Sequence, residues 1–291
     1  MPDAGPYVLG TVQLGLDYGI ANATGHPGPG QAFAILDAAR VAGVSTLDTA
    51  HAYGNSESVI GAWLASRRPA MEVITKTPPL SGGDGDAARR ALTESLEHLG
   101  VRRLAGLLMH RATDWKAPGM SAFIDDVLAH TARAAGVSVY AADEIPEDAR
   151  IGLLQIPANI FTQSIATAPA VTRLVAGGCR IHVRSVLVQG LLLMPPERIP
   201  PRLVETVPAV ARLQAMAREA GCTTTALAIA CVNSLLPTAE LVLGADDPGQ
   251  PCELAAACTS RVPPAAVEAA LALGRSLPER LFDPRFWPEA R

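Results

Sequence analysis

The segment Ala39-Arg40-Val41-Ala42-Gly43-Val44-Ser45 recurs as Ala132-Arg133-Ala134-Ala135-Gly136-Val137-Ser138, and Ala217-Arg218-Glu219-Ala220-Gly221 repeats its first part. Each copy reads as a helix end, a glycine cap and the next strand. The alternative is chance similarity in an alanine-rich chain. We interpret the recurrence as a chain built from repeated strand and helix units.

Short apolar runs that suit buried parallel strands alternate with helix-like segments along the whole chain. The runs lie at about 7–12, 44–48, 71–75, 104–109, 136–140, 152–156, 180–187 and 240–244. The helix-like segments include 31–42, 57–66, 86–99, 121–135, 204–220 and 224–235. Eight such alternations predict an α/β protein of the (β/α)8 TIM barrel class rather than an open doubly wound sheet. The chain has 291 residues, so we expect one domain over 1–291.

Composition excludes several classes of function. Hydrophobic residues make up 49% of the chain and charged residues 18%, so a large core is expected and disorder is not. The net charge is −4, and no basic run suits nucleic acid. No stretch of about 18 apolar residues suggests a membrane span, and Met1-Pro2-Asp3-Ala4-Gly5 does not resemble a signal peptide. We expect a cytoplasmic protein without nucleic-acid or membrane partners, and the oligomeric state stays open.

Cysteine and histidine positions give no sign of a metal site. The five cysteines form no C-x-x-C pair, and free cysteine is commonly a small buried apolar residue. His26 and His51 show no metal-ligand spacing with other histidines, cysteines or carboxylates. We therefore expect no metal.

Lysine is rare in this chain, which carries 22 arginines and two lysines. One of the two, Lys76, ends the apolar run 71–75. Lysine is a compact charge whose pKa shifts readily on burial, which suits it to a pocket. Asp48 and His110 end the neighbouring second and fourth predicted strands. Because active sites of such barrels lie where strands end, these three side chains are expected to converge.

A ten-residue segment after the second predicted strand contains the most specific motif. It reads Asp48-Thr49-Ala50-His51-Ala52-Tyr53-Gly54-Asn55-Ser56-Glu57, and it resembles the aldo-keto reductase signature D-T-A-x-x-Y-G-x-S-E. Lys76 and His110 fall where that family places its other two catalytic residues, and the likeness runs from Leu9 to Gly244. The resemblance implies that Tyr53 is the general acid, Lys76 its tuning neighbour, Asp48 the partner of Lys76, and His110 the group that orients a substrate carbonyl.

The chemistry of these residues supports the same assignment. An isolated tyrosine gives up its proton only near pH ~10, and a cation within hydrogen-bonding reach favours the phenolate. Lys76 would supply that cation, and Asp48 would keep Lys76 charged in a partly dry pocket. A carbonyl held by Tyr53 and His110 would then accept a hydride from a nicotinamide ring. Each residue alone also has a structural interpretation, as a capping carboxylate, a half-buried aromatic or a core histidine.

The resemblance also implies cofactor contacts, and some of these positions depart from the family pattern. The implied contacts are Gly10, Thr11, Ser138, Gln155, Arg184, Ser185, Leu187, Gln189, Gly190, Gly244, Asp246 and Gln250. Ser138 and Gln155 match the family. Val139 replaces the usual asparagine, and Arg184 stands where an aromatic residue commonly stacks on the nicotinamide. A guanidinium can stack on a planar ring, but it adds charge.

The segment after the eighth predicted strand is acidic where the family commonly binds the 2′-phosphate of NADP. Asp246 and Asp247 lie there, and a carboxylate suits an unmodified ribose hydroxyl better than a phosphate. We therefore predict NAD or NADP as cofactor, with a weakened preference for NADP. The alternative is that both aspartates are solvated surface residues.

Our leading hypothesis is a nicotinamide-dependent oxidoreductase acting on a carbonyl or alcohol of a small polar substrate, sugar-like or a natural-product intermediate. Two alternatives remain open. One is a lyase, isomerase or epimerase that reuses Tyr53 and Lys76 without hydride transfer, and the other is a non-enzymatic cofactor-sensing subunit. Loops at about 14–30, 111–120 and 190–203 would set specificity. We expect the tail 282–287 to cover the core.

Overall fold

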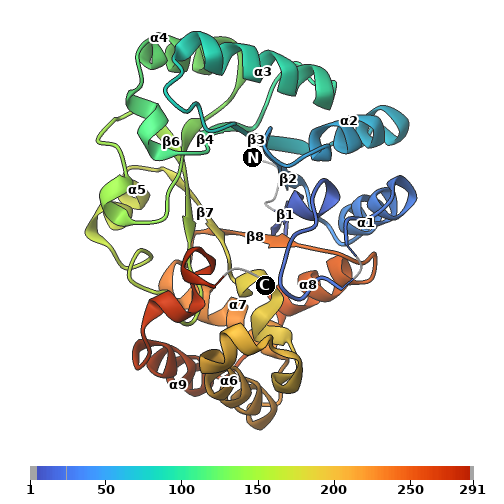
Figure 1. Cartoon of the computed structure of the whole chain (residues 1–291), viewed down its shortest axis with the longest axis vertical. Helices are drawn as coiled ribbons and strands as arrows, with labels where there is room; N and C mark the ends of the chain where they lie inside the picture. The colour runs from blue at the N-terminus through green and yellow to red at the C-terminus, as the bar shows by residue number, and fades with distance from the viewer. Residues whose placement is uncertain (1–4, 24, 289–291) are drawn as a thin grey trace.

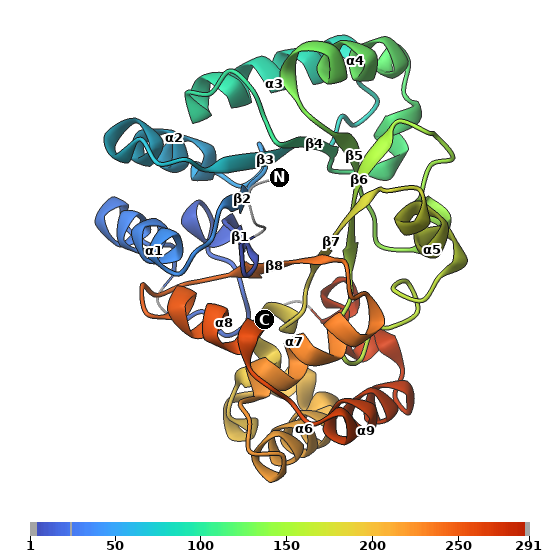
Figure 2. The same cartoon turned by 180° about the vertical axis from the view of Figure 1, so that it is seen from behind.

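Eight parallel strands close into a barrel in the order β1 to β8, so each strand pairs with its neighbour in sequence and β8 returns to β1 (Figures 1 and 2). The computed structural model describes residues 5–23 and 25–288. The strands are β1 Val8–Gly10, β2 Thr46–Asp48, β3 Glu72–Thr77, β4 Gly106–Met109, β5 Ala135–Ser138, β6 Ile151–Pro157, β7 Arg180–Arg184 and β8 Glu240–Gly244. Each overlaps one predicted run, and the (β/α)8 TIM barrel prediction is confirmed.

Helices surround the barrel on its outside (Figure 1). They are α1 Pro29–Val41, α2 Ser56–Arg67, α3 Gly85–Leu99, α4 Met120–Asp126, α5 Pro169–Ala176, α6 Val207–Glu219, α7 Thr224–Leu235, α8 Gln250–Thr259 and α9 Pro264–Arg275. The prediction of one helix over 121–135 is wrong at its end, because α4 passes into a π-helical turn at Val127–Thr131 and β5 begins at Ala135. None of the described helices is both long and apolar enough to span a bilayer.

Local sequence explains where a helix such as α3 begins and ends. The Asp84 side chain accepts hydrogen bonds from the backbone N–H groups of Asp86 and Ala87, which have no partner within the helix. At the other end Gly100 takes a φ of 65°, which glycine adopts without steric cost. These two caps confine the helix to the segment between them.

The three copies of the repeated segment differ in structure. Gly43 ends α1 with a φ of 87° and precedes β2, as predicted. Gly221 also follows a helix with a φ of 67°, but α7 comes next rather than a strand. Gly136 is not a cap at all, because it lies inside β5, where an added Cβ would be 1.6 Å from the backbone oxygen of Leu153. The prediction of a glycine cap is therefore wrong for the second copy, and the prediction of a following strand is wrong for the third.

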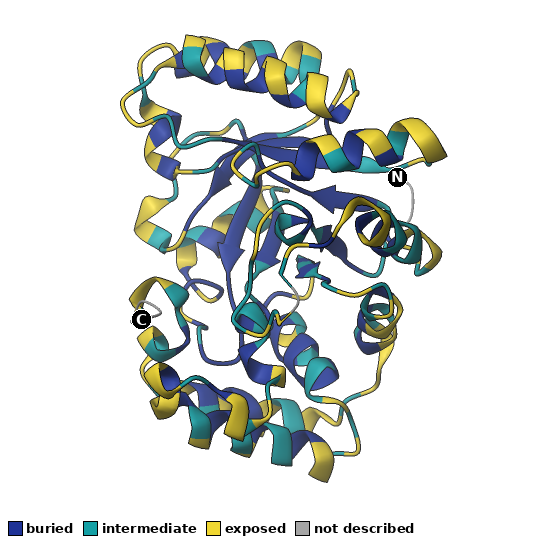
Figure 3. Ribbon diagram, turned by 45° about the vertical axis from the view of Figure 1, so that its right-hand side comes forward, coloured by how far each residue is buried: buried dark blue, intermediate teal, exposed yellow. Residues whose placement is uncertain are grey.

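Burial follows the layers of the barrel. The strands are almost entirely buried, whereas the helices expose their outer faces (Figure 3). Most of the core lies between strands and helices, and a small cluster of Ile74, Ala105, Leu108 and Leu153 fills the barrel interior. Because strand side chains alternate, Lys76 points to the same inner side as Ile74, two residues before it. The charged side chain of Lys76 therefore lies next to this apolar cluster, on the side where the strands end.

The C-terminal tail packs on the barrel rather than away from it. Phe282 is 1% exposed and stacks on Phe161, with ring centroids 3.7 Å apart. The tail segment that contains Phe282 forms two 3-10 turns, Glu279–Phe282 and Pro284–Phe286. The expectation that the tail covers the core is confirmed for its described residues.

Candidate active site

Lys76 and Asp48 form a buried ion pair at the ends of two adjacent strands. The Lys76 Nζ donates to Asp48 Oδ1 at 2.5 Å and to the backbone oxygen of Thr49 at 2.9 Å. Lys76 is 1% exposed and Asp48 is 3% exposed. The register of β2 and β3 explains the contact, since Asp48 lies beside Ile74, and Lys76 is two residues further along.

The charge of Lys76 is maintained by its neighbours. Burial by itself would lower the pKa of the ammonium, but the Asp48 carboxylate and the Tyr53 phenol outweigh burial and raise this pKa above its ordinary value. Lys76 is therefore a permanent cation at neutral pH. A charged ammonium with no water shell acts strongly on whatever group lies beside it.

Tyr53 lies beside this ammonium in the turn between β2 and α2. The Nζ of Lys76 is 5.0 Å from the centroid of the Tyr53 ring. The turn is fixed by backbone hydrogen bonds from Tyr53 to Ala50 and from Ser56 to Tyr53. On its other side the Tyr53 ring meets His110 edge to face, with centroids 5.9 Å apart and planes at 88°. The structure thus brings all four predicted catalytic residues together.

His110 is an uncharged imidazole at neutral pH. Burial lowers its pKa to about 4, and the nearby charges of Lys76 and Arg184 act in the same direction. Its Nδ1 is buried and has no hydrogen-bond partner among the described residues. A neutral imidazole has one N–H group, and that group can donate a hydrogen bond to a carbonyl oxygen.

Gln155 and Ser138 extend the polar network across the barrel. Gln155 Nε2 donates to Asp48 Oδ2 at 2.8 Å, and Ser138 Oγ donates to Gln155 Oε1 at 3.3 Å. Both oxygens of Asp48 are therefore held, one by Lys76 and one by Gln155. In this structure Gln155 fixes the carboxylate, a contact that the sequence did not predict.

Arg184 stacks on an aromatic ring of the protein itself. Its guanidinium carbon is 4.2 Å from the centroid of Tyr140, and its Nη2 donates to the backbone oxygen of Val139 at 3.1 Å. Arg285 from the tail lies 4.1 Å from the centroid of the same ring. Ser185 Oγ completes the contacts of Arg184 by accepting from Nη1 at 3.4 Å.

The predicted cofactor contacts at the ends of β1 and β8, which are Gly10, Thr11 and Gly244, also have structural roles. Gly10 pairs in register with both Asp48 and Gly244, which closes the barrel. Thr11 is fully buried, and its hydroxyl donates to the backbone oxygen of Asp48 at 2.9 Å. At Gly244 an added Cβ would meet the Gln13 side chain at 2.3 Å. These residues shape the strand ends around the ion pair.

The segment after β7 adopts an unusual backbone. Ser185, Val188 and Gln189 have φ values of 64°, 50° and 55°, and Gly190 follows at 85°. Such values are rare for residues other than glycine, and most of all for a β-branched valine. Leu187 packs on the core below. Strain of this kind concentrates at binding and catalytic segments, which agrees with the cofactor role predicted here.

The two aspartates after β8, Asp246 and Asp247, make different hydrogen bonds. Asp246 donates its backbone N–H to Gln250 Oε1 at 2.7 Å, while its own Oδ1 is buried without a hydrogen-bond partner in the described structure. Burial raises the pKa of the Asp246 carboxyl. Asp247 is exposed and accepts from the backbone N–H of Gly249 at 2.7 Å. Asp246 is thus the residue with an unused acceptor.

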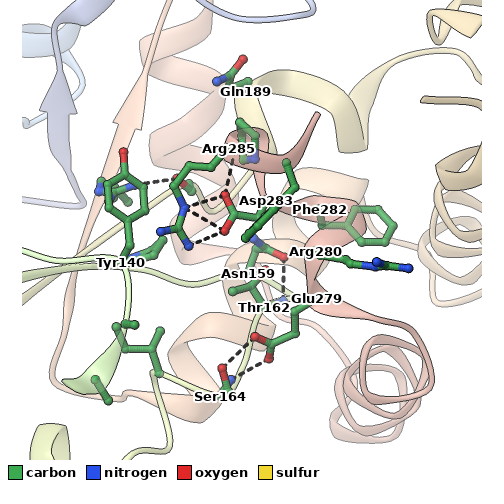
Figure 4. A pocket seen from close by; sticks show the side chains of 18 of the residues that line it. Tyr140, Asn159, Thr162, Ser164, Gln189, Glu279, Arg280, Phe282, Asp283 and Arg285 are labelled. Atoms are coloured by element: carbon green, nitrogen blue, oxygen red, sulfur yellow. Dashed lines mark hydrogen bonds and ion pairs between the residues drawn. The ribbon is translucent and has the colours of Figure 1, made fainter. Parts of the chain in front are cut away.

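A cavity of about 360 Å³ lies between the tail and the segments at the ends of β5, β6 and β7 (Figure 4). Arg184 and Tyr18 line it, and so do residues that the sequence analysis missed. One of them, Asn159, could have been found because it follows a strand end by two positions. Arg285 reaches the cavity from the tail, and no pattern in the sequence signals that. Within the described residues, no group of three histidine, cysteine or acidic side chains is placed to hold a metal ion.

Comparison with known proteins identifies the family. The model of the Aldo/keto reductase family matches residues 7–268. The chain therefore belongs to the aldo/keto reductase family.

Individual relatives are distant or partial. Aldo-keto reductase str7 of Strobilurus tenacellus is 41% identical over 91 residues, which are 30% of this chain and 27% of that protein, so the match spans about a quarter of the relative's length. The glycerol dehydrogenase AKR11B4 of Gluconobacter oxydans has a TM-score of 0.72 at 18% identity, over 92% of this chain and 90% of its own. An aldo/keto reductase of Klebsiella pneumoniae, solved with NADP and acetate, has a TM-score of 0.71 at 18% identity, over 92% and 91%. At these identities the structural likeness shows the fold.

Proposed function

We propose that this protein is an oxidoreductase that transfers a hydride between a nicotinamide cofactor and a carbonyl or alcohol of a small polar, sugar-like or natural-product substrate. Tyr53 is the general acid in reduction and the general base in oxidation. The observation that carries the proposal is the buried Lys76–Asp48 pair, with the Lys76 Nζ 5.0 Å from the Tyr53 ring centroid. A fixed cation beside a phenol stabilises the negative charge that forms when the phenol gives up its proton.

Each residue has a defined part in reduction. The neutral His110 donates a hydrogen bond to the substrate oxygen and orients the carbonyl. As hydride reaches the carbonyl carbon, the oxygen gains electron density and takes the proton of the Tyr53 hydroxyl. Lys76 stabilises the resulting phenolate, and Asp48 keeps Lys76 in place.

The residues present fit a nicotinamide cofactor, which when bound supplies or accepts the hydride. At the adenosine end, the unpartnered Oδ1 of Asp246 and Oε1 of Gln13 are acceptors that suit ribose hydroxyls. At the nicotinamide end, Ser138 and Gln155 bond each other and keep spare hydrogen-bonding capacity for a carboxamide. Arg184 would contribute a planar guanidinium in place of an aromatic ring.

We propose that Asp246 favours NADH over NADPH, because its half-buried carboxylate would repel a 2′-phosphate placed beside it. Titration of the protein with each reduced cofactor, followed by fluorescence, measures this preference. NADH should bind more tightly than NADPH. Asp246→Asn removes the charge and should lower the ratio of the NADPH to the NADH dissociation constant about tenfold. The exposed Asp247→Asn variant is the matched control and should change the ratio little. Tighter binding of NADPH by the wild type would contradict the proposal.

The activity itself is tested by following oxidation of NADH or NADPH with a panel of small aldehydes and ketones. Turnover that depends on both cofactor and carbonyl is expected. The guanidinium of Arg184 is already stacked on Tyr140 and is therefore not free to stack on a nicotinamide ring, and this observation favours the second candidate, acid–base chemistry without hydride transfer. Failure to bind either nicotinamide cofactor would support that second candidate instead.

A further inference from the structure

The cavity between the barrel ends and the tail contains none of the four proposed catalytic residues, but Arg184, Ser185 and Gln189, three of the predicted cofactor contacts, line it. Its walls come from the ends of β6 and β7, from the segments that follow β5, β6 and β7, and from the tail, with Tyr18 of the segment after β1 also in the lining. Tyr53 is near enough to Tyr18 to help burial raise the Tyr18 pKa. No described residue of β8 or α8 lines the cavity, so it is separate from Asp246. Its volume of about 360 Å³ suits part of a small molecule.

Positive charge in this cavity exceeds the negative charge available to balance it. Arg184 and Arg285 both stack on Tyr140, at 4.2 and 4.1 Å from the ring centroid. Asp283 forms an ion pair with Arg285, as Figure 4 shows. Arg184 contacts uncharged acceptors, a backbone oxygen and a serine hydroxyl, and it meets no carboxylate within the described structure. One half-buried guanidinium is therefore left without a counter-charge.

The acidic residue Glu279 also lines the cavity, but its oxygens are already occupied. One oxygen accepts from the backbone N–H groups of Gln163 and Ser164, and the other accepts from the Ser164 hydroxyl. Figure 4 shows the contacts between Glu279 and Ser164. Glu279 thus holds the turn after β6 to the tail. It is not placed to neutralise Arg184, because no ion pair or hydrogen bond joins the two residues in the part of the chain that the structure describes.

Two uncharged donors in the same cavity lack partners. Thr162 Oγ1 is buried and makes no hydrogen bond among the described residues. Asn159 is 1% exposed, and its Oδ1 accepts from the backbone N–H groups of Phe161 and Thr162, so its Nδ2 remains free in the described structure. Buried polar groups without a partner cost about 1–3 kcal/mol each, and a ligand with acceptor oxygens would remove that cost. Unused donors and an unbalanced cation in one cavity suit an anion.

We propose that this cavity is the subsite for an anionic oxygen group, a carboxylate or a phosphate, carried by the carbonyl substrate. Arg184 is its charged partner, and Asn159 and Thr162 donate uncharged hydrogen bonds. The assignment to the substrate rests on the proposed oxidoreductase function, whereas the binding of an anion does not. Arg184, which lines the cavity and whose charge also acts on His110, is thereby a specificity-determining residue.

Direct binding to the full chain tests the anion subsite. Benzoate and phenyl phosphate are the two anionic probes, benzamide is the uncharged control, and titration calorimetry gives the dissociation constants. One of the anions should bind, and which one binds more tightly distinguishes a carboxylate from a phosphate. Benzamide should bind at least about tenfold more weakly, since charge-assisted hydrogen bonds are the strong ones. Equal binding of benzamide, or no binding of either anion, would overturn the proposal.

Variants then locate the bound anion. Arg184→Gln should weaken binding about tenfold or more, and the nearly isosteric Thr162→Val should weaken it severalfold. Arg111→Gln is the matched control, because it removes a charge that also acts on His110 but lies outside the cavity. It should leave binding within about twofold, as should Tyr53→Phe. Loss of binding in Tyr53→Phe with none in Thr162→Val would place the anion beside the catalytic residues and contradict the assignment.

Turnover separates the subsite from the proposed function. With the preferred cofactor, 4-formylbenzoate should have a higher kcat/KM than its uncharged methyl ester, and Arg184→Gln should reduce that ratio about tenfold. Turnover of both aldehydes with no preference for the acid would refute the subsite and leave the oxidoreductase function intact. Anion binding without turnover of any carbonyl would refute the function and leave the subsite intact.

Discussion

Lys76 shows how one residue depends on its neighbours for its chemical state. The ammonium is 1% exposed, and it is kept charged by Asp48, whose second oxygen is held by Gln155. Removing one partner of a buried pair leaves an uncompensated charge, which is more costly than removing both. The same positive field, together with burial, keeps His110 neutral. At neutral pH Lys76 is therefore protonated and His110 is neutral, although both residues lie in the same site.

The neutral state of His110 predicts a dependence of stability on pH. Its pKa is lowered to about 4 in the folded protein, whereas an unfolded histidine titrates near about 6.5. Between these values the unfolded chain binds a proton that the folded chain does not, so stability is full above the higher value and falls as pH falls toward the lower. This contribution is at most about 3.5 kcal/mol.

Urea unfolding of the wild type and of His110→Gln at several pH values isolates that contribution from other titrating groups. From neutral pH down to about pH 4, the wild type should lose more stability than the variant. If the two free energies of unfolding change in parallel, His110 does not have the lowered pKa that its surroundings imply.

At the scale of elements, Glu57 ties α2 to its two neighbours. It is 3% exposed, and its Oε1 accepts from Thr75 Oγ1 of β3 at 2.5 Å. Its Oε2 lies 3.8 Å from Nδ1 of His51 and 3.7 Å from Nδ1 of His98 in α3. One buried carboxylate thus holds a strand and two helices together next to the turn that positions Tyr53.

We predict that Glu57→Ala lowers the free energy of unfolding by about 2–3 kcal/mol, because it leaves the Thr75 hydroxyl unpaired in a buried site. Chemical denaturation measures the change. Glu94→Ala serves as control, since Glu94 approaches His51 Nε2 at 3.6 Å but is 58% exposed, and it should cost less than about 1 kcal/mol. Equal losses in the two variants would contradict this role of Glu57.

The elements also show what could be predicted from the sequence. All eight strands were predictable because parallel strands buried on both faces read as apolar runs, and the ends of three of them located the ion pair and His110. Gly136 was misread because a glycine needed for close approach to Leu153 looks like a glycine needed for a turn. The stacking of Arg184 and Arg285 on Tyr140 could not be predicted, because the three residues lie far apart in the sequence and only the fold brings them together.

At the scale of the whole molecule, the tail completes the barrel mouth. Phe282 anchors it against Phe161, and Arg285 reaches over Tyr140 from the same segment. The fit of the tail therefore determines the shape of the cavity. We predict that Phe282→Ala destabilises the protein by about 3–5 kcal/mol, as expected when a fully buried aromatic ring is removed.

Thermal or urea unfolding measures that loss, and Phe286→Ala is the control. Phe286 belongs to the same tail but is 64% exposed, so its removal should cost less than about 0.5 kcal/mol. A Phe282→Ala variant as stable as the wild type would mean that the tail is not anchored as the structure has it.

If the Tyr53 hydroxyl donates the proton in a hydride-transfer reaction, Tyr53→Phe removes the reactive group and leaves the ring in place. The measurement is kcat for the carbonyl that the wild type reduces fastest, with cofactor affinity and unfolding midpoint determined for both proteins. We expect kcat to fall about 10²- to 10⁴-fold while cofactor affinity and stability stay unchanged. A variant that keeps the wild-type kcat would contradict this expectation.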